Sequence, residues 1–189
     1  SRESDKIRWG ILSTAGIAAS AFIPALRESA RGELVAVASR DRTRGKAFAQ
    51  KHAIGTVFDD YDSLLESDAI DAIYNPLPNT MHAEWTIKAA EAGKHILCEK
   101  PLAVTAEECQ LMIDAANTNN VVLVEAFTHR WNPHMRKARQ LIADGAIGDI
   151  QTIDAALCFN IAEPEGNVRF SQELAGGALW DAGCYAVYA

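Results

Sequence analysis

Residues 9–18 read WGILSTAGIA and join an apolar run to a segment with helical periodicity. The run over residues 7–13 has the length and composition of a buried strand. Apolar residues then recur at the i, i+3, i+4, i+7 spacing of one helix face, and these are Ala18, Ala21, Phe22 and Ala25. A strand that passes through a short turn into a helix is the first half of a βαβ unit, so the stretch predicts an α/β fold.

Small residues fill the turn between this strand and this helix. Ser13, Ala15 and Ala18 stand at the three positions where the dinucleotide pattern G-x-G-x-x-G/A has its small residues. Small side chains let the backbone approach a pyrophosphate, whose charge then meets the N–H groups at the helix start. On these residues alone, a nucleotide site and a tight turn without a ligand are equally supported. The nucleotide-binding candidates are Ser13, Thr14, Ala15, Gly16 and Ile17.

Strand and helix signals continue to alternate over the first two-thirds of the chain. Further strands are expected at residues 34–39, 56–58, 69–74, 96–98 and 121–124. Helices are expected at residues 43–51 and 80–92, the second ending at Gly93, and after a capping box at residues 105–108. This alternation predicts a doubly wound parallel sheet, which binds ligands at the carboxyl ends of its strands.

The pattern changes after Glu125. Residues 1–125 are therefore predicted to form one domain, and residues 126–189 the start of an α+β second domain. A helix is expected after Pro133, a longer strand over residues 150–159 and a last helical stretch after Gly176-Gly177. A second domain of this size is thin, so we expect it to be incomplete and the sequence to be part of a longer protein.

Composition and charge exclude several classes of protein. The 189 residues are 49% hydrophobic and 23% charged, which is typical of globular proteins. The net charge is −7 and no basic patch stands out, so nucleic acid is not an expected partner. No apolar run reaches the roughly 18 residues of a membrane-spanning helix. The four cysteines are widely scattered, which favours neither a disulfide framework nor a metal site, and we expect a cytoplasmic protein.

Arginines follow the second predicted strand in the segment SRDRTR, residues 39–44. Arg40 lies 22 residues beyond Ala18, near the position where NAD enzymes have an acidic residue for the ribose. Arginine suits the 2′-phosphate of NADP instead, so Ser39, Arg40 and Arg44 are candidates to hold that phosphate. A solvated helix start is the alternative, although arginines there oppose the helix dipole.

Two further segments contain groups suited to acid–base chemistry. Glu99-Lys100-Pro101 follows the fifth predicted strand, and its Lys-Pro bond is a candidate for the cis form. Alone, the triplet is better explained by a surface salt bridge. Asp181 and Tyr185 are i, i+4 and would share one face of a helix. A nearby ammonium favours tyrosinate, whereas a buried tyrosine bonded to Asp181 is the structural alternative.

Together these motifs resemble the glucose–fructose oxidoreductase/inositol dehydrogenase (Gfo/Idh/MocA) family over essentially the whole chain. The resemblance rests on WGILSTAGIA (9–18), ASRD (38–41), NPLPNTMH (75–82), CEKPLA (98–103), HRWNP (129–133) and VRF…GGALWDAGCY (168–185). Many members have histidine in place of Tyr185. With a tyrosine at this position, the sequence resembles the branch that contains NADP-dependent D-xylose dehydrogenases, dimeric dihydrodiol dehydrogenases and glucose–fructose oxidoreductase. The resemblance also implies a large, open second-domain sheet, which completes the substrate pocket and often makes a homo-oligomer interface.

The resemblance implies roles for individual residues. Lys100 corresponds to the catalytic lysine beside the nicotinamide, with Glu99 next to it. Tyr185 corresponds to the acid/base, and Asp181 to the partner residue that orients the substrate. The implied cofactor contacts outside the first turn are Ser39, Arg40, Arg44, Pro76, Asn79, His82, Glu99, Lys100 and Arg169. His82 has a second interpretation, as a residue that caps a helix.

Two functions are therefore expected from the sequence. The first is an NADP-dependent dehydrogenase that transfers a hydride between the nicotinamide and a carbinol carbon of a sugar or polyol, as an aldose 1-dehydrogenase does. The second is a non-catalytic NADP-binding regulator of the same family. The presence of both Lys100 and Tyr185 argues for the enzyme.

Overall fold

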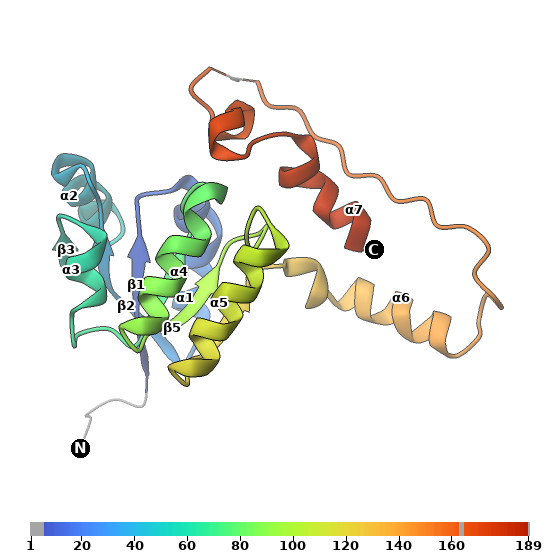
Figure 1. Cartoon of the computed structure of the whole chain (residues 1–189), viewed down its shortest axis with the longest axis horizontal. Coiled ribbons are helices and arrows are strands. Elements are labelled where there is room, and N and C mark those ends of the chain that lie inside the picture. The colour runs from blue at the N-terminus through green and yellow to red at the C-terminus, as the bar shows by residue number, and fades with distance from the viewer. Residues whose placement is uncertain (1–5, 163–164, 189) are drawn as a thin grey trace. The chain divides into compact units, whose positions relative to one another are not determined.

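The computed structural model of the chain describes residues 6–162 and 165–188 (Figure 1). The chain forms two compact units, residues 1–125 and residues 126–189. Each unit has its own set of elements and is described by itself. Within the described residues, no helix has both the length and the apolar character needed to cross a membrane.

The first unit is built on a six-stranded parallel sheet with the strand order β3-β2-β1-β4-β5-β6. The strands are β1 (Ile7–Leu12), β2 (Gly32–Ala38), β3 (Thr56–Phe58), β4 (Ala72–Asn75), β5 (His95–Cys98) and β6 (Leu123–Glu125). Ile11 of β1 lies opposite Val37 of β2 on one side and Tyr74 of β4 on the other. The predicted doubly wound sheet is thus confirmed. Its order reverses between β1 and β4, which is where such sheets bind ligands.

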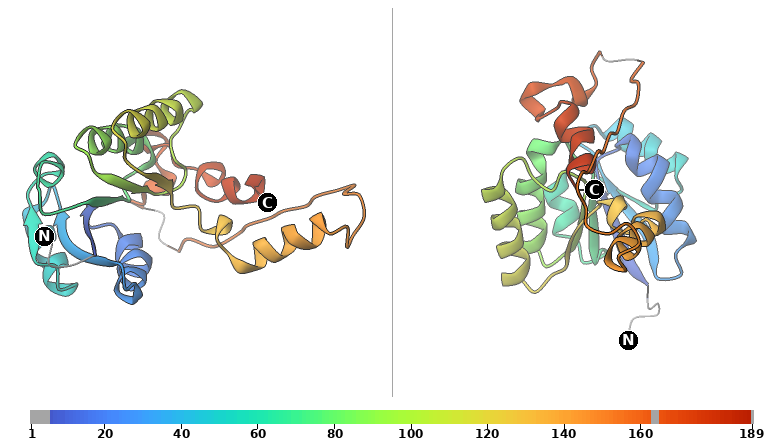
Figure 2. Two further views of the ribbon diagram at one scale, coloured as in Figure 1. Left: turned by 90° about the horizontal axis from the view of Figure 1, so that it is seen from below. Right: turned by 90° about the vertical axis from the view of Figure 1, so that its right-hand side faces the viewer.

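Helices cover both faces of the sheet, because successive strand residues point to opposite sides. Ile11, Val37 and Tyr74 pack on the face covered by η1 (Ala18–Phe22, a π-helical turn), α1 (Ile23–Glu28) and α2 (Arg42–Lys51). Leu12 and Ile73 pack on the opposite face. That face is covered by α3 (Tyr61–Leu65), η2 (Asn79–Met81), α4 (His82–Glu91) and α5 (Ala106–Thr118). Figure 2 shows the two helical layers on either side of the strands.

Helix ends follow the chemistry of the sequence. Gly93 after α4 has a φ of +72°, which glycine adopts without steric cost. Thr105 caps α5, since its Oγ1 accepts a hydrogen bond from the Glu108 amide at 3.1 Å. In a capping box the Glu108 side chain would accept in return from the amide of the cap residue, Thr105. Here its Oε2 accepts from the amide of Val104, one residue earlier. Helix α3 was not predicted from the sequence.

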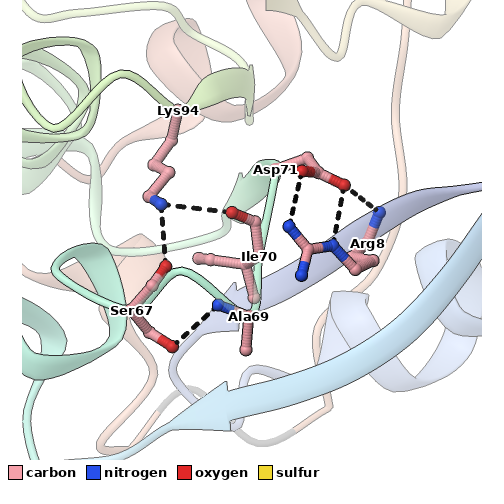
Figure 3. A network of polar contacts seen from close by, with 6 residues as sticks. All are labelled: Arg8, Ser67, Ala69, Ile70, Asp71 and Lys94. Carbon is pink, nitrogen blue, oxygen red and sulfur yellow. Dashed lines mark hydrogen bonds and ion pairs between the residues drawn. The ribbon is translucent and has the colours of Figure 1, made fainter. Parts of the chain in front are cut away.

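Charged side chains join β1, β4 and β5 at their amino ends (Figure 3). Nη2 and Nε of Arg8 donate to the two carboxylate oxygens of Asp71 at 2.8 and 3.0 Å. The buried Lys94 donates from Nζ to the carbonyl oxygens of Ser67 and Ile70, at 2.8 and 3.1 Å. These contacts stabilise the edge of the sheet that lies opposite the ligand edge.

The second unit consists of helices, short helical turns and irregular chain in its described residues. The elements are η3 (Thr128–Arg130), α6 (Pro133–Ala143), η4 (Val168–Phe170), η5 (Gln172–Leu174), η6 (Leu179–Gly183) and α7 (Cys184–Tyr188). The predicted helix after Pro133 is confirmed. The strand predicted over residues 150–159 is wrong, because this segment is irregular and mostly exposed. A strand needs a partner for its backbone groups, and the described part of this unit has no other strand to pair with.

Candidate active site

The turn after β1 keeps its backbone open to solvent. The amide of Ser13 donates to the Ala38 carbonyl at 2.9 Å, and Ser13 has a φ of +87°. The following helical turn begins where the Ala15 carbonyl accepts from the amide of Ala18 at 3.1 Å. Gly16 is exposed, and among the described residues no atom lies within 4 Å of where its Cβ would be. An anionic group therefore has room to approach the start of this helix.

The end of β2 and the start of α2 bring arginines to the same edge. Arg40 is exposed and makes no hydrogen bond or ion pair with other described residues. Nη2 of Arg44 lies 3.4 Å from Oγ1 of Thr14 in the turn after β1. The Ser39 hydroxyl is buried and donates to the Asp41 carbonyl at 2.8 Å. Ser39 thus fixes the turn that presents Arg40, and Arg44 connects that turn to the turn after β1.

Asp41 caps α2 and does not take the place of a ribose-binding acid. Its Oδ1 accepts from the Arg44 amide at 3.0 Å, which satisfies one of the free N–H groups at the helix start. Arg42 forms an ion pair with Asp59 at 3.4 Å. Because Arg42 is paired with Asp59, Arg40 and Arg44 are the two of these three arginines that stay candidates for binding an anion.

The turn after β4 is held by a buried amide side chain. Nδ2 of Asn75 donates to the His82 carbonyl and to Oγ1 of Thr86, both at 3.3 Å, and Oδ1 accepts from the Leu77 amide at the same distance. Pro76 is buried and Asn79 is half-buried at the start of η2. His82 opens α4 with its side chain fully buried. Of the candidates in this segment, Asn79 is partly accessible at the surface.

The turn after β5 contains Glu99, Lys100 and Pro101. The Tyr74 hydroxyl donates to Oε1 of Glu99 at 2.6 Å, and Oε2 accepts from the Lys100 amide at 3.2 Å. Burial, and then the Glu99 carboxylate, raises the pKa of Tyr74, which keeps its hydroxyl protonated. The Lys100–Pro101 peptide bond is cis. The sequence reasoning missed Tyr74, although a polar residue near the end of an apolar strand was the available signal.

The second unit holds the other predicted catalytic residues. Nε of Arg169 donates to Oδ2 of Asp181 at 2.9 Å, so these two candidates lie together. The ring of Tyr185 packs against Phe127 and His129, with centroid distances of 4.8 and 4.5 Å. Sequence reasoning did not identify this aromatic contact, because residues 127 and 185 are far apart in the chain. Lys100 belongs to the first unit, and its approach to Tyr185 stays a prediction.

The described residues contain no cluster of three or more His, Cys, Asp or Glu side chains arranged to bind a metal ion.

Comparison with known families agrees with this geometry. Residues 7–127 match the family described as oxidoreductase family, NAD-binding Rossmann fold, and residues 135–189 match the Gfo/Idh/MocA C-terminal domain. The chain belongs to the Gfo/Idh/MocA oxidoreductase family. The family predicted from the sequence motifs is confirmed.

Several members of the Gfo/Idh/MocA family are similar over nearly all of this chain. D-xylose 1-dehydrogenase (NADP(+)) 2 of Haloferax volcanii is 40% identical over 96% of this chain and 55% of its own length. Trans-1,2-dihydrobenzene-1,2-diol dehydrogenase of Xenopus tropicalis is 38% identical over 95% of this chain and 54% of its own length. The chain thus spans about half the length of the curated relatives it matches.

Solved structures of the family have the same fold. KijD10, a 3-ketoreductase from Actinomadura kijaniata solved with NADP and TDP-benzene, superposes with a TM-score of 0.84 at 35% identity. The match covers 95% of this chain and 55% of that chain. Aldose-aldose oxidoreductase from Caulobacter crescentus superposes with a TM-score of 0.86 at 29% identity, covering 96% of this chain and 56% of its own.

Proposed function

We propose that the protein is an NADP-dependent oxidoreductase that transfers a hydride between the nicotinamide and a carbinol carbon of a sugar or polyol. The observation that carries the proposal is the contact of Arg44 with Thr14, which unites the turn after β1 and the arginines after β2. The turn after β1 lies beside the point where the strand order reverses, between β1 and β4. The names of the relatives, a xylose dehydrogenase and an aldose-aldose oxidoreductase among them, support a sugar-type substrate.

The residues of the first unit fit a bound NADP. The open backbone around Gly16 suits the pyrophosphate, and the exposed guanidinium of Arg40 with that of Arg44 suits the 2′-phosphate. Ser13, Thr14, Ala15 and Ile17 complete the turn, and Ser39 fixes the position of Arg40. We assign Pro76, Asn79, Glu99 and Lys100 to the nicotinamide side, because they follow β4 and β5 at the same edge.

NADP held by these residues would supply the nicotinamide for hydride transfer. In substrate oxidation, Tyr185 acts as the general base that takes the proton of the substrate hydroxyl. The ammonium of Lys100 would favour the tyrosinate and stabilise negative charge on the substrate oxygen. Asp181, held by Arg169, orients the tyrosine hydroxyl or the substrate. In the reverse direction, Tyr185 returns the proton as the general acid.

The proposal includes the wider organisation of the protein. Residues 1–125 are assigned to cofactor binding, and residues 126–189 to part of a substrate and dimerisation domain. The match of residues 135–189 to the family's C-terminal domain supports this division. We further propose a homo-oligomer in the cytoplasm for the full-length protein.

The cofactor preference is tested by titrating the full-length protein with NADPH and NADH at low salt. A charge-assisted hydrogen bond contributes about 1.5–3 kcal/mol, so Arg40→Ala should weaken NADPH binding by roughly tenfold or more. NADH binding should change little. Arg42→Ala is the matched control, because Arg42 pairs with Asp59 and is not assigned to the site. Equal affinity of the unaltered protein for NADPH and NADH would overturn the proposed preference.

Turnover separates the enzyme from a regulator. The protein is assayed for NADPH formation with a panel of aldoses and polyols. The proposed enzyme reduces NADP with at least one class of sugar. Tight NADP binding without turnover on any member of the panel would favour the non-catalytic regulator.

A further inference from the structure

The imidazole of His82 lies between two backbone carbonyl groups. Its Nδ1 is 2.7 Å from the carbonyl oxygen of Pro101, and its Nε2 is 2.8 Å from that of Leu77. Leu77 belongs to the turn after β4 and Pro101 to the turn after β5. The side chain of His82 therefore connects the two turns that flank the proposed nicotinamide side of the site.

The His82 side chain is buried among protein atoms. The residue is only 1% exposed, and both ring nitrogens already face protein oxygen atoms. A neutral imidazole donates to one of these carbonyls and an imidazolium to both. In either form both nitrogens are turned toward backbone oxygens of the protein. A role inside the protein fits this placement better than direct contact with the cofactor.

The backbone of His82 is anchored to the end of β4. The backbone carbonyl of His82 accepts a hydrogen bond from Nδ2 of Asn75, and Oδ1 of Asn75 accepts from the Leu77 amide. Asn75 is the last residue of β4 and is fully buried. The backbone of His82 is therefore fixed to the end of β4, and its ring connects this point to the Pro101 carbonyl.

Lys100 lies between two anchored neighbours. On its N-terminal side, the Glu99 amide donates to the Asn75 carbonyl at 3.0 Å and the Glu99 side chain accepts from Tyr74. On its C-terminal side, the Pro101 carbonyl meets the His82 ring. Proline has no N–H group, so the carbonyl is the only strong backbone hydrogen-bonding group that Pro101 offers.

We propose that His82 is a positioning residue for Lys100. By hydrogen bonding to the Pro101 carbonyl, it fixes the turn after β5 against the turn after β4 and so sets where the ammonium of Lys100 stands. The role of Lys100 in hydride transfer rests on the proposed function. The fixing of the turn does not, because it follows from contacts within the first unit.

Two variants of His82 and one control separate this role from general destabilisation. His82→Phe keeps an aromatic ring and removes the hydrogen bonding of the imidazole to these carbonyls, while His82→Gln keeps an amide donor. Lys94→Met is the matched control. Lys94 is also a buried side chain bonded to two backbone carbonyls (Figure 3). It directly precedes β5 and therefore lies at the opposite edge of the sheet.

Amide hydrogen exchange in the full-length protein measures the turn directly. The reporters are the amides of Glu99, Lys100 and Leu102, which donate to the Asn75 carbonyl, Oε2 of Glu99 and Oε1 of Glu125. A buried carbonyl left without a partner costs about 1–3 kcal/mol, so His82→Phe should speed their exchange by roughly tenfold or more. His82→Gln should speed it less, and Lys94→Met should leave it as in the unaltered protein. Unchanged exchange of all three amides in His82→Phe would overturn the proposal.

Kinetics test the consequence for Lys100. His82→Phe should lower kcat while KM for NADP changes little, and His82→Gln should recover part of kcat. Lys94→Met should keep kcat. A loss confined to NADP affinity would instead show that His82 contacts the cofactor. If the unaltered full-length protein has no turnover, the proposed function fails, but the exchange measurement still decides whether His82 fixes the turn.

Discussion

His82 and His52 lie in surroundings that disfavour a positive charge. Burial is the main cause that lowers the pKa of each from its ordinary value of 6.5. For His52, the nearby charges of Lys51 and Arg27 lower the pKa further. For His82, the carbonyls of Pro101 and Leu77 oppose the effect of burial without cancelling it. Both rings are therefore harder to protonate in the folded protein than in the unfolded chain.

This difference predicts how stability depends on pH. As the pH falls below about 6.5, the unfolded chain takes up protons at these histidines before the folded protein does, so the free energy of unfolding decreases. The stabilising contribution is complete above pH 6.5 and is lost as the pH falls through the lowered pKa values of the folded state. Urea unfolding between about pH 7.5 and 5.5 measures it, and His52→Gln should reduce the slope. A protein that becomes more stable over this interval would contradict the assignment.

At the level of residues, the sequence predicted which side chains are candidates for the site better than it predicted their burial and their hydrogen-bond partners. Lys100 and Arg40 could be selected because a charged residue directly after a parallel strand stands at the ligand edge. The burial of His82 and the hydrogen bond from Tyr74 to Glu99 could not be foreseen. The burial and the hydrogen bond both depend on which turns the strand order brings together. The spacing of residues along the chain does not show which turns become neighbours.

Helix α5 begins at a cap that the sequence shows clearly. The Thr105 hydroxyl oxygen accepts from the Glu108 amide at 3.1 Å. Thr105→Ala should lower the free energy of unfolding by about 1 kcal/mol, because one N–H group at the start of the helix loses its acceptor. Thr105→Ser keeps the oxygen and should stay close to the unaltered protein. Urea unfolding of the two variants compares them, and an alanine variant as stable as the serine variant would show that the cap contributes little.

At the level of elements, the predictions succeeded where a local signal existed. The β strands of the first unit were found from apolar runs, and α6 from the apolar spacing after Pro133. Helix α3 escaped notice because its five residues are too few to show a period, although Asp60 caps it by accepting from the Ser63 amide. Residues 150–159 alternate like a strand, but alternation describes a side-chain pattern and does not supply the partner strand that a sheet requires.

At the level of the whole molecule, the chain combines a unit that matches the family's NAD-binding Rossmann fold with a second unit that matches its C-terminal domain over residues 135–189. The sheet order reverses beside β1, and the predicted phosphate-binding residues gather at that edge. Lys100 follows β5 in the first unit, and Tyr185 lies on α7 in the second. We propose that these two residues act on the same substrate carbinol, Lys100 as a charge-stabilising group and Tyr185 as the acid/base.

The most direct test is the steady-state turnover of NADP with a sugar substrate by the full-length protein and its Tyr185→Phe variant. General acid–base groups contribute about 10²–10⁴-fold, so the variant should lose turnover on that scale while its affinity for NADPH stays nearly intact. Lys100→Met should also lose turnover. A Tyr185→Phe variant with full activity would contradict the account and leave the tyrosine a structural residue of the second unit.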